Sequence, residues 1–184
     1  MPIPDFNHNN VIPPHLGDPT NSNMISPYKA DIMEFCNKFA KSKERINILK
    51  GFVNFRLDCY KWGINIGFQW IDGSFSENIE ISEKRAPHDI DVVTFTGGLS
   101  KEKQHEIIKH FPAFGYSAQS KPLYYVDHYP VLMDVNPMLT IESTKYWIQL
   151  FSHNRKGVWK GMIEIPLYDK TDFDNEALAY LNSL

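Results

Sequence analysis

Two aspartates lie inside a run of strand-forming residues, and this run limits the possible folds more than any other part of the sequence. Asp89 and Asp91 alternate with apolar residues in the stretch DIDVVTF at residues 89 to 95, a composition that favours a β-strand. Because side chains alternate along a strand, both carboxylates point to one face, and Ile90 and Val92 point to the other. The sequence therefore predicts a strand over residues 89 to 96 with one acidic face and one core face.

The spacing of these two acids suits a divalent cation. Carboxylates about 7 Å apart along a strand repel each other when they are unpaired, and this repulsion raises their pKa values. Mg²⁺ or Mn²⁺, which prefer oxygen ligands, would remove the repulsion. We therefore interpret Asp89 and Asp91 as metal ligands. The alternative is a solvated pair of acids, or a pair bound to Lys84 or Arg85.

A glycine-serine step lies upstream of these acids, just past a second strand predicted over residues 64 to 71. Gly73 lets the backbone adopt positive φ and approach a ligand closely. If Ser74 opens a helical turn, its hydroxyl and the free N–H groups there can hold phosphate oxygens. A phosphate site beside bound metal is the arrangement that nucleotide transfer requires.

Periodicity along the rest of the chain predicts an α+β domain, a mixed β-sheet flanked by helices with a helical pair at the start. Prolines fill residues 1 to 25, which predicts an extended arm, and residues 26 to 184 form the domain. Ser26 and Pro27 have the pattern of a helix N-cap and first position. Pro130 predicts an edge strand or a bulge. Helices are expected over residues 27 to 41, 42 to 63, 100 to 111, 140 to 151 and 172 to 183, and further strands over residues 122 to 135 and 158 to 167.

Composition excludes some partners and favours one compartment. A net charge of -3 over 184 residues is not typical of a polybasic nucleic-acid coat or membrane binder. Cys36 and Cys59 fall at apolar helical positions and are interpreted as buried free thiols. No apolar run reaches about 18 residues and no secretory signal is visible. We expect a cytoplasmic protein without a membrane partner; the oligomeric state stays open.

The stretch DGSF at residues 72 to 75, followed by DIDVV at residues 89 to 93, resembles the signature of the polymerase-β-like nucleotidyltransferase superfamily. That signature is a strand, Gly-Ser, a spacer, and Asp-hydrophobic-Asp on the next strand. Residues 45 to 167 also resemble a group of small bacterial proteins without an assigned function. Those proteins share GFQWIDGSF, PHDIDVVTF and FSHNRKGVWKGM.

The resemblance implies a nucleotidyltransferase-like fold and a Mg²⁺-dependent or Mn²⁺-dependent activity. The enzyme would move a nucleoside monophosphate from an NTP to an acceptor hydroxyl on an RNA 3′ end or a protein, in a toxin–antitoxin or phage-defence system. The family carries a third acid on a later strand, for which Asp127 is the candidate and Asp134 the reserve. The implied catalytic and metal-binding residues are Asp89, Asp91 and Asp127. Gly73 and Ser74 would bind the nucleotide.

Two questions stay open at the level of sequence. Arg155 and Lys160 either face the triphosphate or belong to a hairpin turn at Lys156-Gly157. The whole chain is either an enzyme or a non-catalytic binding partner of the same fold, antitoxin-like, whose arm contacts another protein. The position of Asp127 discriminates between these functions, because a metal site without a third acid would be incomplete.

Overall fold

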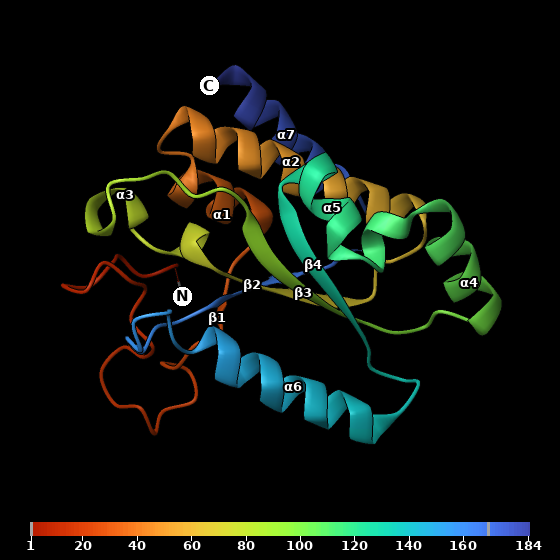
Figure 1. Cartoon of the computed structure of the whole chain (residues 1–184), viewed down its shortest axis with the longest axis horizontal. Coiled ribbons are helices and arrows are strands. Elements are labelled where there is room, and N and C mark those ends of the chain that lie inside the picture. The colour runs from red at the N-terminus through yellow and green to blue at the C-terminus, as the bar shows by residue number, and fades with distance from the viewer. Residues whose placement is uncertain (1, 169) are drawn as a thin grey trace.

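The computed structural model describes residues 2–168 and 170–184, and these form one mixed β-sheet between two unequal layers of helices (Figure 1). The strands are β1 (Tyr28–Lys29), β2 (Gly67–Asp72), β3 (Ile90–Thr96), β4 (Val126–Leu132) and β5 (Ile163–Pro166). The helices are α1 (Ile32–Phe39), α2 (Lys43–Lys61), α3 (Ile79–Ser82), α4 (Lys101–His110), α5 (Ser117–Tyr124), α6 (Pro137–Phe151) and α7 (Asp172–Ser183), with 3-10 turns η1 (Ser74–Ser76) and η2 (Pro112–Phe114).

The strand order in the sheet is β1-β5-β2-β3-β4. Strand β2 runs antiparallel to both of its neighbours, β3 and β5, whereas β3 and β4 are parallel, as are β1 and β5. The expected α+β class, a mixed sheet flanked by helices after a helical pair, is therefore confirmed. Strand β4 lies at one edge, which explains how Pro130, unable to donate a ladder hydrogen bond, is tolerated within it.

The two faces of the sheet differ in how thickly they are covered. Helices α1, α2, α5 and α7 cover one face (Figure 1), and the larger hydrophobic core lies between them and strand residues such as Ile90 and Val92. The other face is covered by α6, whose Trp147 and Phe151 pack with Val93 in a smaller core. The alternation predicted for this strand therefore holds in β3, and Asp91 falls on the thinly covered α6 face.

A buried polar chain fixes the central strands to the helices of the thicker layer. Arg56 of α2, fully buried, pairs with Asp174 of α7 and donates to Gln69 Oε1 at 2.7 Å. Gln69 Nε2 donates to Thr94 Oγ1 at 3.0 Å, which in turn lies 2.7 Å from His128 Nε2. Because breaking a buried ion pair costs about 3–5 kcal/mol, this chain holds β2, β3 and β4 in a fixed register behind the acidic face.

Residues 2 to 25 pack onto the domain. Val11 and Ile12 are fully buried, and the Ile12 carbonyl accepts a hydrogen bond from Gly161 N at 2.8 Å. Val11 also forms an isolated antiparallel bridge with Glu77. Over these residues the arm thus contains no helix and turns at several points, and it contributes Ile3 and Ile12 to the larger core.

The largest errors in the predicted boundaries occurred at three places. Pro27, joined to Ser26 by a cis peptide bond, does not start a helix: residues 28 to 30 bond to β5 instead, and α1 begins at Ile32 behind the N-cap Asp31. Residues 122 to 124 end a helix, and the strand begins only after Tyr125 adopts φ 57°. Residues 158 to 162 precede β5, because Gly161 bonds to the arm instead of to a strand.

Two expectations about composition can also be compared with the structure. Cys36 and Cys59 are free and buried, as expected. Among the residues that the structure describes, no helix is both long enough and apolar enough to span a bilayer.

Candidate active site

Three aspartates lie side by side across the sheet. Asp72, the last residue of β2, is the register partner of Asp91 on β3, and Asp91 is the partner of Asp127 on β4. Directly paired residues project from the same face of a sheet, so these three carboxylates, called here the acid row, share the α6 face. Asp89, two residues before Asp91, adds a fourth acid. The third acid predicted from the sequence therefore faces the other two.

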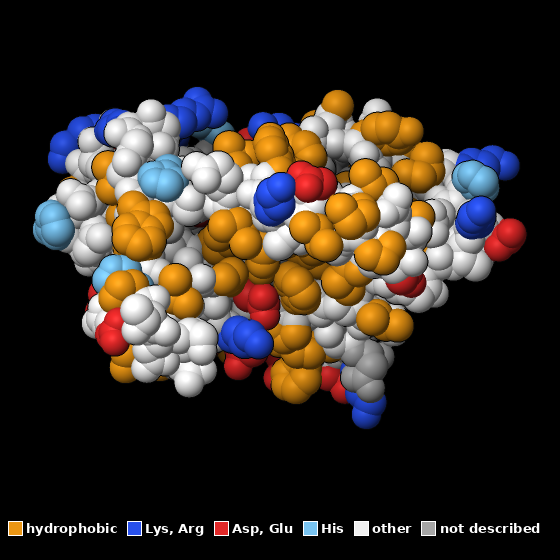
Figure 2. All heavy atoms as spheres, turned by 90° about the horizontal axis from the view of Figure 1, so that it is seen from below, with side chains coloured by type: hydrophobic (Ala, Val, Ile, Leu, Met, Phe, Trp, Pro, Cys, Tyr) orange, Lys and Arg blue, Asp and Glu red, His pale blue; other side chains and the backbone are white. Residues whose placement is uncertain are grey.

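The acid row forms the floor of a cleft of about 860 Å³. Tyr146 and Trp147 of α6 line one side of this cleft, and residues 153 to 156 line its rim. Figure 2 looks onto this face and shows acidic side chains among hydrophobic ones. The cleft is thus large enough for a nucleotide-sized ligand and combines a charged floor with an aromatic wall.

Burial and mutual repulsion make ionisation of the acid row energetically unfavourable. Burial, together with the charges of Asp89, Asp72 and Asp127, raises the pKa of Asp91 to about 7. Burial also raises the pKa of Asp72, to about 6, although the ammonium of Lys160 opposes this shift. At neutral pH the row therefore holds carboxylates that would be stabilised by additional positive charge.

One lysine of α5 supplies part of that charge. Lys121 Nζ lies 2.8 Å from Asp89 Oδ2 and 2.8 Å from Asp127 Oδ2. These hydrogen bonds raise the pKa of Lys121 above its usual value, so the side chain stays protonated. Arg85, an alternative partner considered from the sequence, binds Glu83 instead.

One carboxylate oxygen of the acid row has no hydrogen-bond partner and could bind a ligand. Asp127 Oδ1 is buried and has no hydrogen-bond partner, although its other oxygen binds Lys121. Within residues 2–168 and 170–184, no three acidic, histidine or cysteine side chains form a ready-made metal site. The donor set still fits a hard cation, because the unpaired oxygen and the half-buried Asp91 carboxylate lie on one face and are oxygen ligands.

The glycine-serine step lies directly against the acid row. Gly73 has φ 81° and ψ -167°, a conformation essentially restricted to glycine. A Cβ at this position would lie 2.3 Å from Asp91 Oδ2, so only glycine permits this close approach. Ser74 begins a single three-residue 3-10 turn, η1, and lines the cleft. The helical turn expected after Ser74 is therefore very short.

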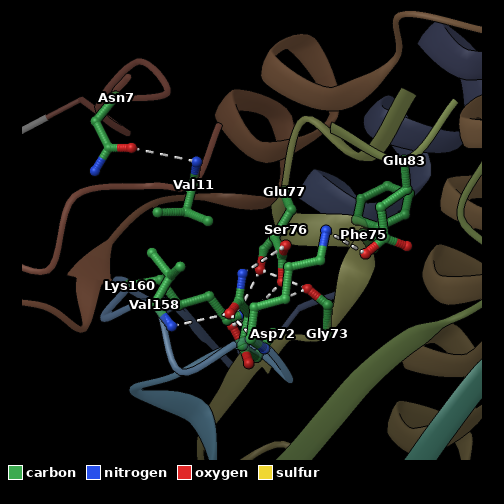
Figure 3. Close-up of polar contacts among 12 residues, drawn as sticks. Asn7, Val11, Asp72, Gly73, Phe75, Ser76, Glu77, Glu83, Val158 and Lys160 are labelled. Carbon is green, nitrogen blue, oxygen red and sulfur yellow. Dashed lines mark hydrogen bonds and ion pairs between the residues drawn. The ribbon is translucent and has the colours of Figure 1, made fainter. Parts of the chain in front are cut away.

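Lys160 holds the Gly73-Ser74 turn in place through three contacts. Its ammonium lies 3.0 Å from Asp72 Oδ1, 2.9 Å from Glu77 Oε1 and 3.0 Å from the Gly73 carbonyl oxygen (Figure 3). These contacts use all three N–H donors of an ammonium group, and the side chain is only 2% exposed. Lys160 is thus near the predicted nucleotide site, but it is arranged to hold the turn.

Arg155 occupies a different environment from Lys160. It is exposed, lines the cleft, and lies within a tight turn closed by a hydrogen bond from Gly157 N to the Asn154 carbonyl at 2.9 Å. Its neighbour Lys156 binds Glu83 at 3.1 Å. The turn predicted at Lys156-Gly157 is therefore present, and it places the Arg155 guanidinium at the rim.

Comparison with known proteins gives one match. The model of a family of unknown function, DUF6932, matches residues 4–166. The chain belongs to the DUF6932 family. The match includes all five strands and most of the N-terminal arm, and α7 lies beyond it. No curated protein and no solved structure matches this DUF6932 chain.

Two members of the site were not identified from the sequence. Asp72 belongs to the acid row, and the alternation of Trp70 and Asp72 along β2 could have assigned it to the α6 face. No sequence pattern indicated Lys121, because it reaches the acids from a separate helix. The reserve acid Asp134 lies past the opposite end of β4, where its Oδ2 accepts from Gly98 N at 2.6 Å.

Proposed function

We propose that this chain is a Mg²⁺-dependent or Mn²⁺-dependent nucleotidyltransferase that moves a nucleoside monophosphate from an NTP to an acceptor hydroxyl. The observation that carries this proposal is the register of β2, β3 and β4, which aligns Asp72, Asp91 and Asp127 beside the Gly73-Ser74 turn. Sites for phosphoryl transfer combine carboxylates that hold metal with a backbone turn that approaches phosphate.

Asp89, Asp91 and Asp127 would hold the metal ions. The unpaired Oδ1 of Asp127 supports this assignment, since a buried carboxylate oxygen without a partner is costly unless a ligand binds it. A bound cation would neutralise the carboxylates and polarise phosphate oxygens.

The remaining roles follow from position and charge. Ser74 offers a hydroxyl to the phosphates, and Gly73 lets them approach the backbone. Arg155 at the rim supplies a guanidinium that suits phosphate geometry. In the transfer, the acceptor oxygen forms a bond to the α-phosphorus, the bond to pyrophosphate breaks, and the hydroxyl proton passes to a carboxylate or to water.

The class of acceptor follows from the resemblance of the DGSF and DIDVV motifs. An RNA 3′ end or a protein hydroxyl is the proposed acceptor, in a toxin–antitoxin or phage-defence setting. A reducing cytoplasm is the proposed compartment, because Cys36 and Cys59 are both free and buried.

Incubation of the purified chain with each α-labelled NTP, Mg²⁺ and cell extract tests the activity. We expect label to appear on RNA or protein with the wild type and not with Asp91→Asn. Asp134→Asn is the matched control, because it removes an acid from the opposite end of β4. Absence of label with every NTP, in extracts from which RNA and protein are both analysed, would contradict the proposal.

A second candidate is a non-catalytic partner of the same fold. The observation that favours it is that two lysines already pair with three of the acids: Lys121 binds Asp89 and Asp127, and Lys160 binds Asp72. Calorimetric titration with NTP separates the two functions. An enzyme should bind NTP measurably in Mg²⁺ and weakly in chelator. Equal affinity in both conditions, or no binding in either, would favour the non-catalytic partner.

A further inference from the structure

The two lysines that contact the acids differ in how firmly they are held. Lys160 is 2% exposed and contacts three oxygen atoms, so it is a fixed part of the glycine-serine turn. The side chain of Lys121 is 49% exposed, and its ammonium contacts Asp89 and Asp127 at 2.8 Å each. An ammonium has three N–H donors, so these two contacts leave one donor available. Because ion pairs with an exposed partner are weak, Lys121 can change partners far more easily than Lys160.

The backbone of Lys121 is fixed even though its ammonium is accessible. Its carbonyl accepts a hydrogen bond from Tyr125 N at 3.0 Å at the end of α5, and β4 begins with the next residue, Val126. Helix α5 packs beside β4 (Figure 1). A change of partner therefore comes from rotation about the flexible four-carbon stem of the side chain, and it requires no change of fold.

Lys121 and a divalent cation compete for the same pair of acids. The ammonium lies 2.8 Å from an Oδ2 atom of Asp89 and of Asp127. A Mg²⁺ ion bound to these carboxylates would lie closer still to its oxygen ligands, at about 2.0–2.1 Å. The two cations repel each other at such short range, even where they use different oxygens of one carboxylate. When the acids bind metal, Lys121 therefore leaves them and needs another anion.

The phosphates of a nucleotide are that anion. Lys121 and Ser74 line the same cleft. Asp127 is the register partner of Asp91, whose carboxylate lies against Gly73. The proposed phosphate turn is therefore one strand away from an acid that Lys121 contacts. On the basis of the nucleotidyltransferase function proposed above, we propose that Lys121 moves from the acids to the phosphates of an incoming NTP, and so makes metal and nucleotide bind cooperatively.

The cooperativity follows from charge. Metal alone releases the Lys121 ammonium into a cleft that holds no other anion for it. NTP alone meets the carboxylates of the cleft floor, which repel its phosphates. When both bind, the metal neutralises the carboxylates and Lys121 pairs with phosphate, so each ligand strengthens the binding of the other. Removing the charge of Lys121 should therefore strengthen the binding of metal alone and weaken the binding of the metal–nucleotide complex.

Calorimetric titration of the full chain tests this pair of opposite effects. The probes are Mn²⁺ alone, and the α,β-methylene analogues of ATP, GTP, CTP and UTP in saturating Mn²⁺, because the methylene group prevents transfer. Compared with the wild type, Lys121→Met should bind Mn²⁺ alone at least about fivefold more tightly and the best analogue at least about fivefold more weakly. Lys121→Gln, which removes the charge but keeps a hydrogen-bond donor, should shift both affinities in the same directions.

The matched control is Lys156→Met, because Lys156 lines the same cleft but binds Glu83 instead of the acid row. It should not strengthen the binding of Mn²⁺, and circular dichroism should show that all variants are folded. If both Lys121 variants bind the analogue as tightly as the wild type, or bind Mn²⁺ no more tightly, the role of Lys121 is overturned while the proposed function stands. A wild type that binds no analogue in Mn²⁺ would overturn both.

Discussion

Asp91 lies directly across from Asp127 on the neighbouring parallel strand, and no other pairing of β3 with β4 would bring these two acids together. A shift of one residue in this register would turn one of the carboxylates into the core. The register is held from the opposite face by Thr94 and His128, which lie 2.7 Å apart. The alignment of Asp91 with Asp127 on one face of the sheet therefore depends on the hydrogen bond between Thr94 and His128 on the other face.

We expect Asp91→Asn to stabilise the metal-free protein at about pH 8, by on the order of 1 kcal/mol or more. The reason is that burial and neighbouring acids raise the folded-state pKa of Asp91 from 3.8 to about 7. The folded wild type therefore binds the proton more tightly than the unfolded chain, and its stability falls as pH rises through this window. The gain from Asp91→Asn should be largest above about pH 7 and disappear near pH 4.

Urea unfolding in chelator at several pH values measures this effect. The same variant should lose the metal dependence of NTP binding. A metal-free Asp91→Asn protein that is less stable than the wild type above pH 7 would identify Asp91 as a structural partner instead of a metal ligand.

Lys121→Met should increase the response of the protein to divalent cations. Removing the ammonium leaves Asp89 and Asp127 uncompensated, so the metal-free protein should melt at a lower temperature, and Mn²⁺ should raise the melting temperature more than in the wild type. Thermal melts with and without Mn²⁺ measure the difference. Lys109→Met, at an exposed position of α4, is the control and should behave as the wild type. Equal Mn²⁺ responses in all three proteins would indicate that the cation does not bind at these acids.

Lys160→Met should destabilise the fold by about 3–5 kcal/mol, because it leaves Asp72 and Glu77 buried without their shared cation. Denaturant unfolding measures this loss, and Lys156→Met, which removes an exposed cation from the same turn region, should cost less than about 1 kcal/mol. If Lys160→Met is equally mild and weakens NTP binding instead, then Lys160 contacts the nucleotide directly, as one interpretation of the sequence held.

Gly73→Ala should be far more damaging than Gly157→Ala, although both glycines have positive φ. At Gly157 nothing lies within 4 Å of an added Cβ, so the substitution costs only backbone strain, about 1–2 kcal/mol. At Gly73 the added Cβ also overlaps the Asp91 carboxylate. Chemical unfolding and NTP titration of both variants test this. Similar losses for the two would show that the turn and Asp91 can separate easily.

Alternation and turn chemistry were sufficient to predict the central part of the site. Asp89 and Asp91 were placed on one face because strand geometry is local, and Gly73 was recognised because few residues adopt its backbone conformation. Asp127 was chosen by resemblance, and the strand register then brought it beside Asp91. The roles of these residues in catalysis stay predictions.

The parts that were missed depend on long-range packing. Lys121 reaches the acids from a helix that was not predicted, because the apolar residues 122 to 125 favoured a strand. The positive charge of Lys160 suggested a nucleotide contact, but only the folded arrangement shows that Lys160 pairs with Asp72 and Glu77. Ser26 and Pro27 matched a helix start, yet residues 28 to 30 find better partners on β5. A local pattern cannot reveal which distant backbone will compete for the same groups.

The Lys160 contact also has a consequence for synthesis on the ribosome. Asp72 and Glu77 are made first, whereas the lysine that pairs with both of them is 83 residues beyond Glu77 and must leave the exit tunnel before it can reach them. A nascent chain shorter than this must keep both acids hydrated, because burial without a counter-ion is prohibitive. The turn that shapes the cleft therefore reaches its final form only after Lys160 has emerged, 83 residues after Glu77.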